Sequence, residues 1–231
     1  MSKKNIVFLS ESIPEIWNLL NEKEQEIITL NSRIVDIKKN EIIYKEGEIS
    51  HDLMCLCAGK VKIHKEGVGG RNQIVRMIRP SQYFGYRAYF ANEPYVTAAS
   101  AFETSTICYI PMDIIEGLIV KNPGLGLFFI KELSTDLGIA DERVVNLTQK
   151  HIRGRLAESL IFLMDNYGLE EDGATISIYL SREDLANLSN MTTSNAIRTL
   201  STFVDERLIA LDGRKIKIID AEKLNKISRI G

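Results

Sequence analysis

Cysteine is scarce in this chain of 231 residues, and long apolar runs are absent. The chain has three cysteines, Cys55, Cys57 and Cys108, which is an odd number. Apart from the Cys-Leu-Cys run at Cys55 and Cys57, they do not have the spacing of metal ligands. This argues against a disulfide framework and indicates reduced, buried thiols. No stretch approaches the roughly eighteen consecutive apolar residues that a membrane-spanning helix needs, and the first residues lead into no such run. We therefore expect a soluble, cytoplasmic protein with no membrane partner.

An excess of charge of either sign is also missing, with 29 Lys plus Arg against 31 Asp plus Glu. The overall charge therefore indicates neither nucleic acid nor an anionic membrane as a partner, and any basic binding surface has to be local. The length allows one large domain or two small ones, each with a proper core, and we favour two.

The spacing of apolar residues in the first half of the chain changes from a helical to a strand-like pattern at residue 34. Apolar residues recur every three or four positions over residues 11–31, which predicts short amphipathic helices. Residues 34–111 break into short β-rich runs separated by glycines or polar clusters, which is typical of a β-sandwich or barrel. The runs begin at Ile34, Ile42, Leu53, Val61, Ile74, Tyr95 and Thr106. Gly47, Gly59 and Gly85 fall where strands must turn a corner.

A helical period returns after Pro111 and is regular over residues 124–150. Apolar residues step by three and four as in the seam of a coiled coil, with charged residues on the flanks. These candidate seam residues are Ile130, Leu133, Leu137, Ala140, Val144 and Leu147. We favour a helix that pairs with a second copy of the chain; a single buried amphipathic helix is the alternative.

Two short helices with a tight turn between them are predicted over residues 181–203. Ser181 and Asp184 have the spacing of a capping box, and a first helix buries Leu185, Ala186 and Leu188. Asn190 tolerates the left-handed conformation of a turn, and Thr192 can cap the next helix. That second helix is expected to bury Met191, Ala196, Ile197, Leu200 and Phe203. The arrangement is a helix-turn-helix.

Short polar side chains are poor helix formers, yet they fill the first turn of that second helix. In a helix-turn-helix this turn enters the DNA major groove, where such residues let the backbone approach and can bond to bases or phosphates. Arg198 follows one turn later and can pair with guanine. The candidate DNA-binding residues are Ser181, Arg182, Thr192, Thr193, Ser194, Asn195, Arg198, Arg214 and Lys215.

A hairpin is predicted next, with strands at 208–211 and 216–219 around the turn signal Asp212-Gly213. Arg214 and Lys215 lie at its tip, so the hairpin resembles the wing of a winged helix; a structural helical hairpin with an ordinary β-ribbon is the alternative. Polar and apolar residues alternate over residues 175–180, which predicts a further strand. The region beyond residue 152 has no net positive charge, although three of its acids share the 170–172 loop.

These motifs together resemble the CRP/FNR family of bacterial transcription regulators over nearly the whole chain. The resemblance rests on Gly47, Gly59 and Gly85, on GRLAESL from Gly154, on SREDLAN from Ser181 and on IRTLSTF, which contains Arg198. It implies an α+β fold: an N-terminal β-roll, which is a double-stranded jelly roll of the cyclic-nucleotide-binding type, a long dimerisation helix and a C-terminal winged helix. The expected domains are residues 1–122, 123–151 and 152–231.

The resemblance also implies a homodimeric, sequence-specific regulator that binds a palindromic double-stranded DNA site and contacts RNA polymerase, without enzymatic activity. Thr193 and Ser194 stand where the family's commonest base-reading pair is Arg-Glu, so the target sequence should differ from the usual half-site.

Several departures affect the effector pocket that the family implies. Tyr86 occupies the position of the family's ribose-binding glutamate. Val96-Thr97 occupies the position of the Arg-Ser pair that binds the cyclic phosphate. Ala140-Asp141 replaces the adenine-reading pair. A buried phosphate would lack its bidentate cation, so we expect no cyclic AMP binding. The pocket candidates are Gly85, Tyr86, Arg87, Ala88, Val96, Thr97, Ala140 and Asp141.

No cofactor is predicted outright, but two alternatives stay open. Haem-binding relatives exist, so His51, His64 or His151 is a candidate axial ligand of haem, and an unknown small effector is the other option. The four-cysteine iron–sulfur site of the FNR branch does not fit three cysteines in β segments. A cupin-like enzyme would need clustered histidines, and a nucleotide-binding docking module would need intact phosphate ligands; the sequence has neither.

Overall fold

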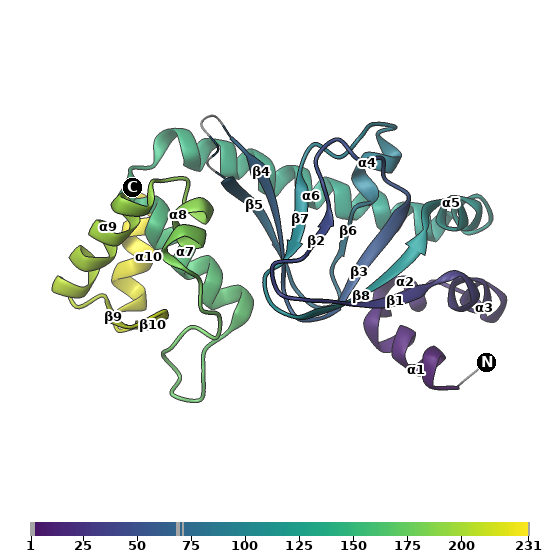
Figure 1. The fold of residues 1–231 in the computed structure, drawn as a ribbon, viewed down its shortest axis with the longest axis horizontal. Helices are drawn as coiled ribbons and strands as arrows, with labels where there is room; N and C mark the ends of the chain where they lie inside the picture. The colour runs from purple at the N-terminus through teal and green to yellow at the C-terminus, as the bar shows by residue number, and fades with distance from the viewer. Residues whose placement is uncertain (1–2, 68–69, 71, 231) are drawn as a thin grey trace. The chain divides into compact units, whose positions relative to one another are not determined.

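The computed structural model describes residues 3–67, 70 and 72–230. They form two compact units (Figure 1). The first unit comprises the chain up to Glu66 together with Val75–Leu137. The second comprises the chain from Gly138 onward together with the described part of residues 67–74. The long helix α6 (Pro123–Gln149) contributes to both.

Three N-terminal helices cover part of the first unit: α1 (Lys3–Ser12), α2 (Pro14–Trp17) and α3 (Glu22–Asn31). Asn21 caps α3 with a full capping box in which the Glu24 carboxylate accepts from the Asn21 backbone N–H at 2.9 Å. Ile13 and Ile16 are fully buried against the strands that follow. The helices predicted over 11–31 are confirmed, and the first starts earlier than predicted.

Two four-stranded antiparallel sheets form the roll, in the orders β1-β8-β3-β6 and β2-β7-β4-β5 (Figure 1). The strands are β1 (Arg33–Ile37), β2 (Ile42–Tyr44), β3 (Asp52–Ala58), β4 (Val61–Glu66), β5 (Asn72–Ile78), β6 (Tyr83–Phe84), β7 (Ala98–Ala101) and β8 (Ser105–Pro111). Alternating side chains of both sheets bury one core, as in other jelly rolls. The predicted jelly roll is confirmed; β6 was not predicted, and β7 begins three residues later than the predicted run at Tyr95.

Two glycines are fixed by close approaches in this roll. Gly59 has φ +89°, and a Cβ there would lie 2.4 Å from Ser105 Oγ and 2.5 Å from the Thr104 carbonyl oxygen. Gly85, with φ +88°, is the N-cap of the short helix α4 (Tyr86–Phe90) and lies against Met54. At Gly59 both the positive φ and the nearby backbone exclude a side chain, whereas at Gly85 the positive φ is the main constraint, because the nearest atom is the flexible end of Met54.

Helices α5 (Met112–Lys121) and α6 follow the roll. In the first unit, Leu125 and Phe129 of α6 are buried in the core shared with α1–α3. Other apolar side chains of α6 are exposed: Leu127, Ile130, Leu137, Ile139, Val144 and Val145. Of the predicted seam, Ile130, Leu137, Ala140 and Val144 are exposed, while Leu133 and Leu147 are half-buried. The helix itself agrees with the prediction within one residue at each end.

The second unit is a winged helix. Its elements beyond α6 are α7 (Ile152–Tyr167), α8 (Arg182–Leu188), α9 (Thr193–Asp205), β9 (Ile209–Asp212), β10 (Lys215–Ile218) and α10 (Ala221–Ile230). Leu160, Leu200, Phe203 and Leu224 are buried in its core. The terminal helix α10, which packs along α7, was not predicted.

Two predicted details of this unit are wrong. Residues 175–180 do not form a regular strand; only Thr175 and Ile176 make isolated bridges, to Lys217 and Leu169. In the hairpin, Asp212 pairs directly with Lys215, so the two turn residues are Gly213 and Arg214 rather than Asp212 and Gly213. Gly213 takes the first turn position with φ +56°, a conformation that glycine adopts without strain.

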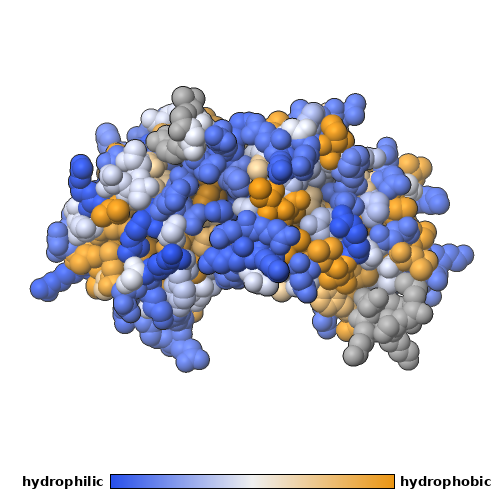
Figure 2. All heavy atoms as spheres, in the orientation of Figure 1, coloured by the Kyte–Doolittle hydropathy of each residue, from blue (hydrophilic) through white to orange (hydrophobic). Residues whose placement is uncertain are grey.

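Figure 2 shows hydrophilic residues over most of one face, interrupted by separate apolar patches. Among the described residues, no helix is both long enough and apolar enough to cross a membrane.

Candidate DNA-binding surface and effector pocket

Local hydrogen bonds define the helix-turn-helix. Ser181 Oγ caps α8 by accepting from the Asp184 backbone N–H at 3.0 Å, and Thr192 Oγ1 caps α9 by accepting from the Asn195 N–H at 3.3 Å. Asn190 takes the left-handed conformation in the turn, with φ +49°. The predicted caps and turn are confirmed. Ser181 and Thr192 therefore have a structural role, whatever they contact in addition.

The apolar stripe of α9 sets which side chains the helix exposes. Ala196, Leu200 and Phe203 are 0–1% exposed and face the core of the unit. Thr193, Ser194 and Arg198 lie on the exposed side, as predicted, and Asn195 is half-buried. The prediction for Ile197 is wrong: its side chain is 48% exposed, because it projects from the polar side of the helix.

Arg182, the first residue of α8, ties the helix-turn-helix to the wing. Its Nη2 donates to the carbonyl oxygen of Gly213 at 2.8 Å. Its Nη1 is buried without a hydrogen-bond partner among the described residues. One N–H donor of Arg182, a predicted DNA-binding residue, is thus already used in a hydrogen bond to the tip of the wing.

Acidic residues of the 170–172 loop pair with the wing lysines. Lys215 Nζ lies 3.3 Å from a Glu170 carboxylate oxygen, and Lys217 Nζ lies 3.3 Å from Asp172. Backbone N–H groups of Thr175 and Ala174 hold the pKa of Asp172 well below its usual range, so this carboxylate stays charged. Arg214 is exposed at the tip. The sequence located these acids but did not predict that they reach the wing.

The predicted effector residues of the first unit do not form one open pocket. Tyr86 and Ala88 are each 2% exposed, whereas Val96 is 45% exposed. Arg87 points outward and pairs with Glu93 at 2.7 Å. Thr97 is half-buried and hydrogen-bonds to the Tyr44 side chain.

Aromatic and ionic contacts fill the roll beside α4. The Tyr86 ring packs 5.2 Å from the Phe129 ring, and burial raises the pKa of Tyr86 so that its phenol stays neutral. Arg76 of β5 and Asp136 of α6 form an ion pair near this phenol. Tyr44 is half of a stacked ring pair, with Tyr95, at 3.8 Å. These partners could not be paired from the sequence, since they lie far apart along the chain.

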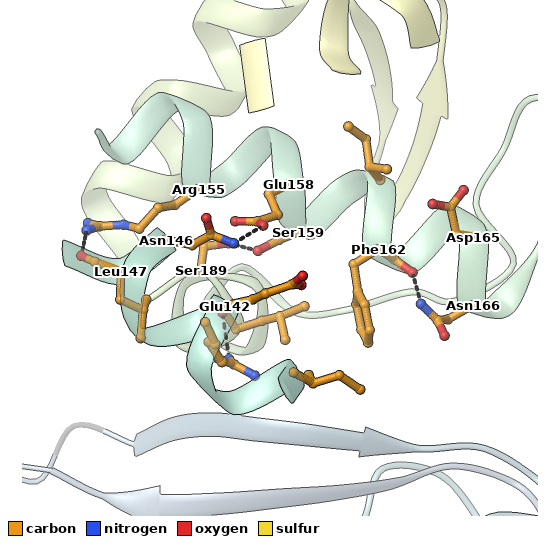
Figure 3. Close-up of a pocket in the computed structure, with 14 residues that line it drawn as sticks. Glu142, Asn146, Leu147, Arg155, Glu158, Ser159, Phe162, Asp165, Asn166 and Ser189 are labelled. Atoms are coloured by element: carbon orange, nitrogen blue, oxygen red, sulfur yellow. Dashed lines mark hydrogen bonds between the residues drawn. The ribbon is translucent and has the colours of Figure 1, made fainter. Parts of the chain in front are cut away.

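Ala140 and Asp141, which stand where the family has its adenine-reading pair, are both exposed on α6 in the second unit. A cavity of about 360 Å³ lies between the C-terminal half of α6 and α7 in that unit (Figure 3). Its walls pair with one another: Asn146 Nδ2 donates to Glu158 at 2.6 Å and Ser189 Oγ to Ser159 Oγ at 2.8 Å. None of the predicted effector residues lines it.

The three histidines lie in different surroundings. His64 Nε2 lies 3.2 Å from Ser100 Oγ, and His151 is exposed before α7. His51 lines a hollow of about 610 Å³ in the first unit, together with the carboxylates Glu93 and Glu116. These carboxylates would repel the propionates of a haem. Among the described residues, no group of three or more His, Cys, Asp or Glu is placed to hold a metal ion.

Comparison with known proteins agrees with this architecture. The family model of the cyclic nucleotide-binding domain matches residues 34–122, and that of the Crp-like helix-turn-helix domain matches residues 154–227.

Among characterised relatives, the CRP-like cAMP-activated global transcriptional regulator of Mycobacterium tuberculosis is 25% identical over 203 residues, which cover 87% of this chain and 91% of that protein. The anaerobic regulatory protein of Pasteurella multocida is 26% identical over 211 residues, 90% of this chain and 77% of that protein. Among solved structures, FixK2 from Bradyrhizobium japonicum has a TM-score of 0.76 at 20% identity, covering 85% of this chain and 96% of that chain.

Fold and comparisons together define a DNA-binding transcription regulator with a cyclic-nucleotide-binding-type roll. The chain belongs to the CRP/FNR family.

The pairing of the wing lysines generates a prediction about the salt dependence of DNA binding. Arg214→Ala should flatten the plot of log affinity against log salt by about one unit, because one phosphate is no longer neutralised. Lys215→Ala should flatten it less, because Glu170 already neutralises Lys215 in the free protein. Fluorescence anisotropy with the full-length protein and random-sequence duplex DNA at several salt concentrations measures both slopes. Equal flattening by the two variants would contradict the role given to Glu170.

Proposed function

We propose that the chain is a homodimeric, sequence-specific regulator that reads a palindromic DNA site through α9 and the wing, and that it does not respond to cyclic AMP. The polar face of α9 carries the proposal: Thr193, Ser194 and Arg198 are exposed on one side while the opposite stripe is buried. We also propose that the chain has three domains, residues 1–122, 123–151 and 152–231. It is proposed to contact RNA polymerase and to act in the cytoplasm.

Arg198 is proposed as the anchor of base reading. Its side chain is exposed one turn beyond Ser194, and a guanidinium can donate two hydrogen bonds to O6 and N7 of guanine. The short Thr193 and Ser194 side chains let the helix backbone come close to the base edges. Ser181, Arg182, Thr192, Asn195, Arg214 and Lys215 complete the proposed surface as phosphate-contacting or supporting residues.

Replacement of Arg198 tests this proposal directly. Arg198→Ala should weaken binding to the cognate palindrome far more than binding to random DNA, and should relax the preference at one guanine per half-site by about 1–3 kcal/mol. Binding selection from a random duplex library, followed by sequencing, measures the preference. Arg229→Ala, which removes an exposed arginine of α10, is the charge-matched control and should leave the motif unchanged. A motif unchanged by Arg198→Ala would assign Arg198 to phosphate binding or structure.

Self-association is proposed through the exposed face of α6. Leu137 is 63% exposed and Val144 61% in the single chain, so this stripe is free to bury against the same stripe of a second copy. Ile130, Leu133, Ala140 and Leu147 continue the stripe at spacings of three and four.

A buried charge should break this contact. Leu137→Glu should give a monomer in sedimentation equilibrium, because an unpaired carboxylate in an apolar seam costs several kcal/mol. Ile139→Glu places the same charge on the other side of α6, at a position that is 57% exposed, and should leave the dimer intact. A dimer that survives Leu137→Glu with unchanged affinity would show that the seam lies elsewhere.

The absence of cyclic AMP binding is proposed from the side chains that occupy the roll. A phosphate needs a cation, but Val96 stands at the family's arginine, Arg87 is paired with Glu93, and the Arg76 guanidinium is held by Asp136. The buried Tyr86 phenol takes the place of a ribose-binding carboxylate.

Calorimetric titration of the full-length protein with cyclic AMP should therefore give no saturable heat in the micromolar range. Val96→Arg alone should not restore binding, since Tyr86 still lacks the carboxylate that would accept from the ribose hydroxyl. A micromolar dissociation constant for the unaltered protein would refute this part of the proposal.

A further inference from the structure

Ile197 is an unexplained apolar side chain on the polar side of α9. At 48% exposure it contributes little to the core of the winged helix, and a β-branched residue on a helix surface gains nothing in helix propensity over its polar neighbours. It lies in the second turn of α9, four residues after Thr193, three after Ser194 and four before Ser201. These spacings place Ile197 in the middle of the exposed stripe.

Side-chain direction brings Ile197 to the same surface as the base-reading residues. Side chains on a helix lean toward its N-terminus, so Ile197 covers the turn that carries Thr193 and Ser194. Its four-carbon side chain is longer than either hydroxyl side chain and projects beyond them. In a helix-turn-helix, the N-terminal turns of the second helix are the part that contacts base edges. An apolar group therefore stands among polar ones where the helix would meet the major groove.

Only one base offers an apolar partner there. The major-groove edge of thymine carries the C5 methyl group, whereas cytosine presents an amino group that would be left without an acceptor against an isoleucine. We propose that Ile197 contacts the C5 methyl of one thymine in each half-site and so selects thymine at that position. This inference rests on the proposed DNA-reading role of α9 and assigns to it a base preference beyond the guanine proposed for Arg198.

Deoxyuridine, which is thymidine without the C5 methyl group, tests this contact. The motif is first recovered by binding selection with the full-length protein, and each thymine of the half-site is then replaced singly by deoxyuridine. At one position the unaltered protein should bind about fourfold more weakly after a change in one half-site, and about fifteenfold more weakly when both half-sites are changed.

The matching protein variant is Ile197→Ala. The exposed position and the high helix propensity of alanine leave the fold intact, which circular dichroism verifies. Ile197→Ala should bind the thymine and deoxyuridine sites with equal affinity. Val204→Ala is the control: Val204 is 36% exposed on the same side of α9 but two turns further from its N-terminus, so the variant should keep the full preference for thymine.

The outcomes distinguish failure of the thymine contact from failure of the proposed function. If the selection recovers a motif but no thymine is sensitive to removal of its methyl group, or if Ile197→Ala keeps the same sensitivity, the thymine contact is wrong and DNA reading by α9 stands. If the selection recovers no enriched sequence, the proposed function fails and this inference falls with it.

Discussion

Burial of one stripe of α9, formed by Ala196, Leu200 and Phe203, is the interaction on which the proposed DNA-binding surface depends. Removing these side chains from water fixes the rotation of the helix about its own axis. The rotation then determines that Thr193 and Arg198 face outward. The caps at Ser181 and Thr192 add a second constraint, because they fix where the two helices begin and how close the turn brings them. A polar recognition surface thus follows from an apolar contact on the other side of the same helix.

In the roll, by contrast, side chains pair with one another and close the interior. Tyr44 of β2 stacks on Tyr95, Tyr86 of α4 packs on Phe129 of α6, and the Arg76–Asp136 pair joins β5 to α6. An arginine and a carboxylate that neutralise each other leave little free charge to attract a phosphate. Under the proposal that the chain does not bind cyclic AMP, the fold of a cyclic-nucleotide-binding domain is present without the groups that recognise the nucleotide. Fold and ligand are therefore separate questions in this chain.

Most of the architecture could be predicted from the sequence because its signals are local. The capping residues, the left-handed Asn190 and the regular spacing along α6 each depend on residues within one or two turns. One failure was local, and the others came from interactions between residues distant in the sequence. Ile197 was assigned to the core from its apolar character, but the period of the helix places it outside. The hairpin turn moved by one residue because strand pairing, rather than the Asp-Gly signal, set the register. The Glu170–Lys215 pair joins residues 45 positions apart, beyond the reach of any pattern.

The acidic loop beside the wing bears on how a regulator finds its site in a genome. Non-specific affinity for DNA comes almost entirely from cations that displace counterions at phosphates. With Lys215 and Lys217 already paired to carboxylates, the wing adds less to that affinity than its sequence suggests. Under the proposed function, fewer molecules are then held on the many competing sites of the chromosome, and discrimination depends more on the proposed base-contacting face of α9. On this proposal, the carboxylates that pair with the wing lysines lower non-specific binding and leave a larger share of the protein free of non-specific DNA.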